Sequence, residues 1–242
     1  MTDELEPKDR IIVDLDVSNL TAAEFIIRDL VRHVGCFRIP LRLHSTVGGP
    51  AAVRLINSLG GKAFYSGKFH DTPPNVGMAA KEVARMGVKM FDVHASSGSK
   101  ALKAAVRNKG DSLVFAVTLF PMLSGEEETI YGSSGIDKVC QFALMAKDAG
   151  CDGIICSPKD FEWVCYNRML ESLAKAVSGV FPKWAWGNRK GLLTPGEAIK
   201  AGATYVILDA SIMNPPKDMG TPAHAAELIA EEISFALEHK EK

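Results

Sequence analysis

A recurring join between helix-like and strand-like segments limits most strongly what this chain can fold into. At each join, a helix-like segment ends in glycine and an apolar run follows at once. Glycine just past a helix accepts the left-handed conformation that closes the last turn, so each join predicts a short helix-to-strand loop. Repeated joins of this kind, with strands that are apolar on both faces, predict parallel βα units. The four clearest joins are residues 59–64, 86–91, 149–154 and 201–206.

Filling in between these joins gives eight βα units. A length of 242 residues suits one (β/α)8 barrel, which typically needs about 250. We therefore predict an α/β protein, a TIM barrel that forms a single domain over residues 1–242. An open doubly-wound sheet is the alternative, but no Gly-x-Gly-x-x-Gly loop follows the first strand. The expected strands are 10–16, 36–43, a third from 63, then 88–94, 112–119, 153–156, 174–180 and 205–209.

Helix and strand signals differ in strength along the chain. Thr21 and Glu24 have the spacing of a capping box, and so do Thr194 and Glu197, with Pro195 between them in the first turn. Residues 25, 26, 30 and 31 form the expected apolar stripe of the first helix. Residues 174–180 are compatible with a helix, and only their position in the series assigns them to a strand. A last amphipathic helix is expected over residues 223–237.

Composition excludes several classes of protein. The formal net charge is −1 and 24% of residues are charged, which does not indicate a nucleic-acid or anionic-membrane partner. The acidic N-terminus has no apolar core typical of a signal peptide, and no apolar run approaches the length of a membrane span. Five cysteines lack CxxC spacing, which favours reduced, mostly buried thiols. We therefore expect a soluble, cytoplasmic protein.

Ionisable residues gather where the expected strands end. Lys68, His70 and Asp71 follow a short apolar run and precede Pro73. Strand residues two apart face the same way, and in a barrel such ends converge on the C-terminal mouth. A lysine beside aspartates in a partly dry pocket can act as a proton donor, a base or a nucleophile. The pairs expected to share a face are Asp14 with Asp16, Ser66 with Lys68, and Asp92 with His94.

Simpler explanations exist for several of these residues. Charged residues at strand ends are often only solvated or paired, although Asp14 and Asp16 lie within an apolar run where an unpaired charge is costly. His70 alone fits a hydrogen-bonded structural histidine. A metal site from Asp14, Asp16, Asp92 and His94 is conceivable on ligand type, but no spacing signature supports it, so we predict no metal. The Trp184 and Trp186 loop is expected to pack on the rim.

Several motifs together resemble the orotidine 5'-monophosphate decarboxylase family almost end to end. Residues 12–16 resemble the family's first strand, which ends in Ala-Leu-Asp, and residues 68–71 resemble the Lys-x-x-Asp half of its Asp-x-Lys-x-x-Asp motif. Residues 92–95, 156–158 and 194–198 follow in family-like order. The resemblance implies a homodimeric lyase of pyrimidine biosynthesis that binds a nucleotide-like ligand and needs no cofactor. It also implies that the aspartate of the Lys-x-x-Asp segment completes the site of the second copy.

The same comparison indicates that functional positions are altered. Ser66 stands where the family has the aspartate two residues before its catalytic lysine, and Arg38 stands where it has a second lysine. Pro40 replaces a glycine, Asn75 ends a Pro-Pro-Asn that replaces Pro-Asn-Thr, and residues 121–122 replace a Thr-Ser pair that faces the pyrimidine. One hypothesis is that Asp14, usually alanine in the family, supplies the charge near Lys68 that Ser66 does not.

The phosphate-binding positions differ most. Asp209 and Ala210 replace the Gly-Arg pair after the last strand, which removes an arginine and adds an anion. Arg189 aligns with a phosphate-contacting glutamine, and Lys190 beside it is a second candidate cation for this position. From the resemblance we predict catalytic roles for Lys68, Asp71, Asp16, Arg38 and Asp14. We predict substrate-binding roles for Ser66, His94, Asn75, Pro158, Arg189 and Asp209.

Three functions therefore remain open. The favoured one is a diverged family enzyme in which Lys68 acts as acid, base or Schiff-base former on a ligand without the usual nucleotide phosphate. The second is a working decarboxylase with a rearranged site. The third is a non-catalytic homologue that binds a ligand or a partner.

Overall fold

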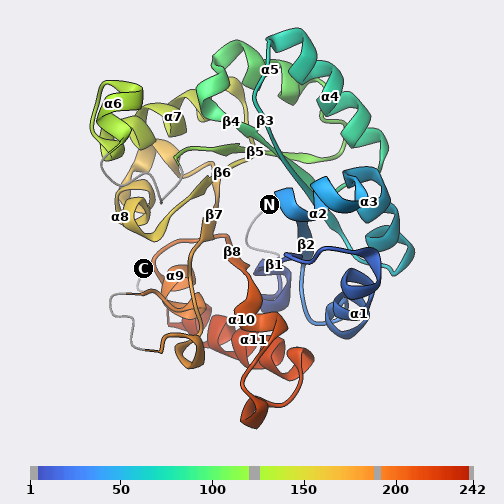
Figure 1. The fold of residues 1–242 in the computed structure, drawn as a ribbon. Coiled ribbons are helices and arrows are strands. Elements are labelled where there is room, and N and C mark those ends of the chain that lie inside the picture. The colour runs from blue at the N-terminus through green and yellow to red at the C-terminus, as the bar shows by residue number, and fades with distance from the viewer. Residues whose placement is uncertain (1–4, 120–125, 188–191, 240–242) are drawn as a thin grey trace. The chain divides into compact units, whose positions relative to one another are not determined.

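The structure is a computed structural model and describes residues 5–119, 126–187 and 192–239. Its parallel strands follow one another in a closed barrel in the order β1 to β8, with helices between them (Figure 1). The predicted (β/α)8 barrel is therefore confirmed. The strands are β1 Ile11–Asp14, β2 Cys36–Ile39, β3 Ala63–Phe69, β4 Met90–His94, β5 Leu113–Val117, β6 Gly153–Cys156, β7 Ala174–Ser178 and β8 Tyr205–Leu208.

The helical elements comprise α-helices and several short 3-10 helices. No helix within the described residues is long and apolar enough to cross a membrane. The α-helices are α1 Leu20–Leu30, α2 Leu41–Val47, α3 Gly49–Ser58, α4 Pro73–Arg85, α5 Ser99–Arg107, α6 Glu127–Tyr131, α7 Gly135–Ala149, α8 Pro158–Tyr166, α9 Pro195–Lys200, α10 Ala210–Met213 and α11 Pro222–Glu238. The 3-10 helices are η1 Pro7–Arg10, η2 Ala95–Ser97, η3 Arg168–Leu170, η4 Lys183–Ala185 and η5 Lys217–Met219.

Contacts divide the chain into two compact units, and each is described by itself. The first unit comprises Met1–Ser66 and Gly179–Lys242, and the second is Gly67–Ser178. In the first unit β1 pairs with β2 and β8, and β2 pairs with the first half of β3. In the second unit β4, β5, β6 and β7 pair in sequence. The assignment of the whole chain to one domain stays a prediction.

The predicted capping box at Thr21 is wrong, although α1 begins at Leu20, close to the predicted start. Asn19 is the N-cap, and its Oδ1 accepts a hydrogen bond from Ala22 N at 2.8 Å. Thr21 therefore lies inside the first turn, where its hydroxyl cannot serve as the cap. The predicted apolar stripe is also only partly buried, because the Leu30 side chain is fully buried while Phe25 is 74% exposed.

The first two strands are shorter than predicted. β1 ends at Asp14, because Asp16 N and Val17 N turn back to the carbonyls of Asp14 and Leu15, each at 2.8 Å. β2 ends at Ile39, because Pro40 has no N–H to donate and α2 begins immediately after it. Asp16 is consequently not a strand residue, and the predicted pairing of Asp14 and Asp16 on one strand face is wrong.

The second unit confirms the uncertain seventh strand. Ala174–Ser178 pairs in parallel with β6, and Ala174 N donates to Asp152 O at 2.9 Å. Ladder hydrogen bonds with a buried neighbour decide the conformation of a segment whose own pattern also suits a helix. Between β5 and α7 the structure has the short helix α6, and residues 120–125 lie outside the described part of the chain.

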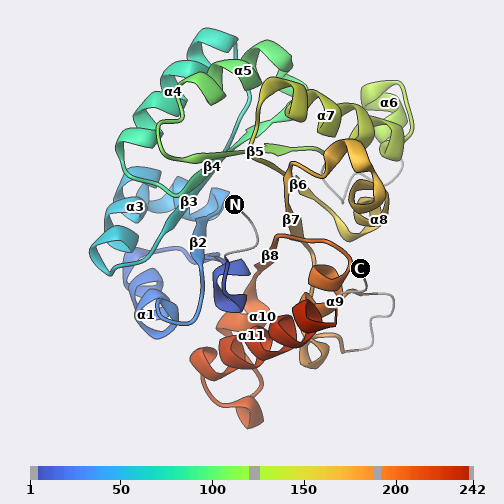
Figure 2. The same cartoon turned by 180° about the vertical axis from the view of Figure 1, so that it is seen from behind.

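Neighbouring helices are joined by specific contacts within each unit. In the second unit α4 lies along α5, where a Cβ on Gly77 would come 3.5 Å from the Ala104 Cβ (Figure 1). In the first unit α9 lies beside α11 (Figure 2). The predicted capping box of Thr194 and Glu197 is confirmed. Glu232 of α11 adds to it by accepting from the Thr194 hydroxyl and, at 3.0 Å, from Gly196 N.

The close packing at the start of β6 generates a stability prediction. A Cβ on Gly153 would lie 2.4 Å from the Phe115 ring and 2.6 Å from Ala174 O. We expect Gly153→Ala to lower the free energy of unfolding by about 1–3 kcal/mol, because overpacking forces the strands apart. Urea denaturation measures the change. Gly77→Ala in α4 is the control, and we expect it to stay within about 1 kcal/mol of the parent because a helical alanine offsets a tight contact. Equal losses in both variants would contradict the packing argument.

Candidate functional site

Strand register places a charged pair in the first unit. Asp14 of β1 lies opposite Arg38 of β2, and Arg38 lies opposite Phe64 of β3. Arg38 Nη1 donates to Asp14 Oδ2 at 3.1 Å, and both side chains are largely buried, at 12% and 18% exposure. The Arg38 guanidinium also lies 5.8 Å from the centre of the Phe64 ring. The predicted residues Asp14 and Arg38 are thus brought together in a partly dry ion pair, which stabilises both charges.

Asp16 is more exposed than its sequence context predicted. Its side chain is 56% exposed and its Oδ1 lies 3.6 Å from Arg42 Nη1. An ion pair this exposed contributes little to stability. Asp16 therefore keeps a solvated carboxylate, available for contact with a ligand.

The end of β8 carries an anion where the family resemblance implies a phosphate site. Asp209 is the N-cap of the short helix α10, and its Oδ1 accepts from Ser211 N at 3.2 Å. Ala210, the next residue, has no group that can bind an anion. The Asp209 carboxylate therefore already accepts the Ser211 N–H, and its negative charge makes binding of a second anion at this position less favourable.

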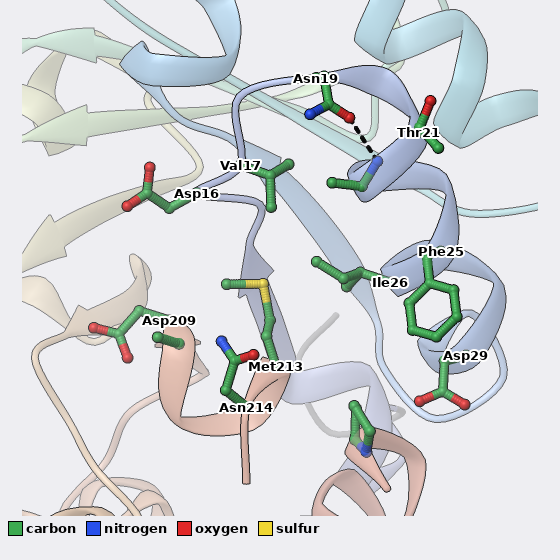
Figure 3. A pocket seen from close by; sticks show the side chains of 13 residues that line it. Asp16, Val17, Asn19, Thr21, Phe25, Ile26, Asp29, Asp209, Met213 and Asn214 are labelled. Atoms are coloured by element: carbon green, nitrogen blue, oxygen red, sulfur yellow. Dashed lines mark hydrogen bonds between the residues drawn. The ribbon is translucent and has the colours of Figure 1, made fainter.

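Asp16 and Asp209 also line a cavity of about 640 Å³ within the first unit (Figure 3). Asp29 contributes a third carboxylate, and Figure 3 shows Met213 and Ile26 between it and the other two. No lysine or arginine lines this cavity in the part of the chain that the structure describes. Its acidic and apolar lining makes it a poor site for a phosphate dianion.

Lys68 has an unusual backbone conformation in the second unit. Its φ is +46°, the one positive value at a non-glycine residue among those described. Such a conformation costs roughly 1–3 kcal/mol unless its surroundings hold it. Asp92 of β4 provides this support, because its Oδ1 accepts from Lys68 N at 2.5 Å and its side chain is fully buried. The lysine is thus held near the end of β3 by a carboxylate from the next strand, β4.

Asp71 and Asn75 lie together at the start of α4. Asp71 Oδ1 accepts from Thr72 N at 2.6 Å and from Asn75 Nδ2 at 3.0 Å. These two hydrogen bonds hold the pKa of the exposed Asp71 carboxyl below its usual value. Asp71 therefore presents a stable negative charge at the surface of this unit, and Asn75 positions it.

His94 lies at the end of β4, two residues beyond Asp92, and is 7% exposed. Its Nδ1 lies 2.6 Å from Ser96 Oγ, and Ser96 Oγ lies 3.0 Å from His70 Nε2. Burial, followed by the positive charges of His70 and Lys68, lowers the pKa of His94 to about 4. His94 is consequently a neutral imidazole at neutral pH.

The remaining predicted site residues are less informative. Ser66 is buried at 2% exposure. Pro158 opens α8, behind Ser157, whose hydroxyl donates to Asp160 Oδ2 at 2.6 Å. Arg189 and Lys190, like the substituted pair at 121–122, lie outside the described residues.

The tryptophan loop is tied to backbone carbonyls of the first unit. Trp186 Nε1 donates to Phe181 O at 2.8 Å, and Trp184 Nε1 donates to Ser211 O at 3.4 Å. These bonds satisfy both indole N–H groups, as expected for a packed loop.

The sequence pattern does not reveal how two residues support the predicted site residues Lys68 and His94. The sequence predicts that Asp92 is a polar strand residue on the same face as His94, but its contact with the Lys68 backbone depends on packing between elements. Ser96 was not identified at all, although it stands two residues after His94, where a loop hydroxyl can reach the ring. No group of three or more histidine, cysteine, aspartate or glutamate side chains arranged to hold a metal ion occurs within the described residues.

Burial of His94 generates a prediction of pH dependence. The pKa of His94 is lower in the folded state than the usual 6.5, so its contribution to stability is fully present above about pH 6.5 and is lost as pH falls towards 4. The difference corresponds to up to about 3 kcal/mol. We expect His94→Gln to lose less free energy of unfolding than the parent between pH 7 and pH 4.5, measured by urea denaturation. Parallel losses in both proteins would show that His94 is not responsible.

Comparison with known proteins identifies the family of the chain. Residues 9–221 match the model of the "Orotidine 5'-phosphate decarboxylase / HUMPS family". An orotidine 5'-phosphate decarboxylase of Moorella thermoacetica is 34% identical over 96% of this chain and 94% of its own, and one of Geotalea daltonii is 36% identical over 94% and 97%. The crystal structure of the Lactobacillus acidophilus enzyme of this name matches with a TM-score of 0.78 at 26% identity, covering 92% of this chain and 98% of that one. The protein therefore belongs to the orotidine 5'-phosphate decarboxylase / HUMPS family.

Proposed function

We propose that this protein is a carbon–carbon lyase that decarboxylates orotidine 5'-phosphate, with Lys68 as the proton donor. The observation that carries the proposal is the Lys68 backbone, held in a left-handed conformation by the buried carboxylate of Asp92. Strained backbone that the surrounding structure supports is typical of catalytic positions. Relatives with the printed name of this activity match nearly the full length of the chain, which supports the same assignment.

The proposed reaction needs one proton. The bond between the pyrimidine ring and its carboxylate breaks, carbon dioxide leaves, and the electron pair stays on the ring carbon. The Lys68 ammonium then gives its proton to that carbon and becomes a neutral amine. No oxidant, reductant or metal enters this balance, and we propose that the enzyme works without a cofactor. A general acid placed in this way contributes roughly 10²–10⁴-fold to the rate.

The other predicted site residues receive roles from the family resemblance. We assign the Asp14–Arg38 pair to the charge network around the lysine, where Asp14 would supply the negative charge that Ser66 lacks. Asp16 would contact the ribose hydroxyls, because its carboxylate is exposed. His94 and Asn75 would contact substrate, with Pro158, Ser66, Arg189 and Asp209 at its edges.

Assembly and location are part of the proposal. In a homodimer, Asp71 of one copy would complete the site of the other, and its lowered pKa would keep it charged there. We further propose a cytoplasmic enzyme of pyrimidine biosynthesis.

A second candidate function is favoured by a specific observation. Asp209 caps α10 and Ala210 follows it, so the segment after β8 offers an anion instead of an arginine. This arrangement favours a diverged lyase whose ligand lacks the 5'-phosphate, with the same proton transfer from Lys68. A non-catalytic homologue would show neither reaction.

Replacement of Lys68 tests the catalytic assignment. We expect Lys68→Ala to lower kcat for orotidine 5'-phosphate by roughly 10²-fold or more, because the proton donor is lost. The loss of ultraviolet absorbance on decarboxylation measures the rate. Lys62→Ala, a change to an exposed lysine immediately before the same strand, is the matched control and should retain activity. Activity that survives in Lys68→Ala would exclude this residue as the acid.

Restoring the family's phosphate residues separates the two candidate functions. We expect the double variant Asp209→Gly/Ala210→Arg to lower KM for orotidine 5'-phosphate by about tenfold or more, because an arginine–phosphate pair contributes about 1.5–3 kcal/mol. The KM for orotidine, which lacks the phosphate, should not change. If the parent turns over orotidine faster than its 5'-phosphate, the second candidate is correct. If neither compound is consumed, both candidates are wrong.

A further inference from the structure

A chain of hydrogen bonds leads inward from the surface of the second unit. His70, at its outer end, is exposed, and its Nε2 lies 3.0 Å from Ser96 Oγ. The same hydroxyl lies 2.6 Å from Nδ1 of the buried His94. The two imidazole rings are 5.8 Å apart between centres, so Ser96 bridges them. Two titratable rings and a hydroxyl in line are the components of a proton relay.

The hydrogen-bond donors around His94 determine the direction in which these hydrogen bonds can pass a proton. Ser96 N also donates to His94 Nδ1, at 3.3 Å, so this nitrogen is an acceptor in the neutral ring. The proton of neutral His94 is therefore on Nε2. Ser96 Oγ can then donate to His94 Nδ1 while it accepts from His70 Nε2. Each of these three side chains can therefore donate one proton towards Lys68 and accept another proton from the solvent side.

The inner end of this series of hydrogen bonds is linked to Lys68 through β4. Asp92 and His94 are two residues apart on β4, so their side chains share a face, and Asp92 binds the Lys68 backbone. The charge of Lys68 contributes to the lowered pKa of His94, which indicates that the ammonium acts on the ring. His70 follows Lys68 by two residues and also contributes to the lowered pKa of His94.

We propose that His70, Ser96 and His94 form a relay that returns a proton from solvent to Lys68 after each turnover. The relay rests on the proposed function, in which Lys68 is left as a neutral amine. His94 Nε2 gives its proton to the amine, His94 Nδ1 takes the Ser96 hydroxyl proton, and the Ser96 oxygen takes one from His70. His70 regains its proton from water. One proton thus moves inward, no bond between heavier atoms changes, and rotation of the hydroxyl with exchange at His94 resets the chain.

The three residues are positioning and proton-transfer groups for Lys68, and a merely structural role must be distinguished from this one. The hydroxyl of Ser97 provides the matched control. It lies in the same turn, η2, and donates to His94 O at 2.7 Å, so it supports the backbone of His94 without touching the ring. Ser97→Ala therefore removes an equivalent hydrogen bond and leaves the relay intact.

The deciding measurement is the hydrogen-exchange rate of the Lys68 ammonium with water, read by NMR on protein with ¹⁵N-labelled lysine. This measurement does not require decarboxylation. We expect Ser96→Ala and His70→Asn each to slow exchange roughly a hundredfold, the low end of what a placed acid–base group contributes. Ser96→Thr, which keeps a hydroxyl, and Ser97→Ala should exchange like the parent. Unchanged exchange in Ser96→Ala, or equal slowing in Ser97→Ala, would overturn the relay.

Turnover gives a second readout. In the active enzyme, we expect Ser96→Ala to lower kcat and raise its solvent isotope effect while KM for orotidine 5'-phosphate stays constant. A change in KM alone would contradict the relay and indicate a substrate-binding role. If the parent shows fast, Ser96-dependent exchange at Lys68 but no turnover, the relay stands and the proposed decarboxylation fails. If turnover is normal in Ser96→Ala and exchange is unchanged, the relay fails and the decarboxylase remains.

Discussion

A fully buried carboxylate needs hydrogen-bond donors, and Asp92 meets this need in part through the backbone N–H of Lys68. This single interaction explains why a lysine tolerates a left-handed conformation at the end of β3. Satisfying the carboxylate supplies part of the energy that holds this backbone. The hydrogen bond between Lys68 N and Asp92 helps to position three side chains. These are Lys68 itself, His70 two residues after it, and His94 two residues after Asp92.

Charge is distributed unevenly over the residues that the family uses. In the first unit Asp14 and Arg38 neutralise each other, and the surroundings of Asp16 and Asp209 are acidic. In the second unit the ammonium of Lys68 acts on the neutral ring of His94. The acidic cavity of the first unit therefore favours hydroxyl or cationic groups over a phosphate. In the second unit, the ammonium of Lys68 favours a negative charge nearby.

Local signals in the sequence predicted some elements fully and others only in outline. The capping box at Thr194 was predictable because all its donors and acceptors lie within four residues. β6 was predicted to the residue, since glycine and proline enclose a short apolar run. The start of α1 was not, because Thr21 and Asn19 both have suitable side chains and only the path of the incoming chain selects Asn19. β7 was assigned by its place in the series, and its pairing with β6 supplies the reason.

The sequence by itself determined the βα repeat and the barrel, because these depend on periodicity and on short joins between neighbouring residues. It also predicts Lys68 as a catalytic residue, from a motif of neighbouring residues. Only the tertiary structure decided which groups touch. Register between strands brought Arg38 to Asp14, packing brought Asp92 to the Lys68 backbone, and the turn after β4 placed Ser96 between two histidines. Contacts of this kind join residues 24 to 26 positions apart or lie in a turn whose geometry the sequence pattern does not specify, so no local signal encodes them.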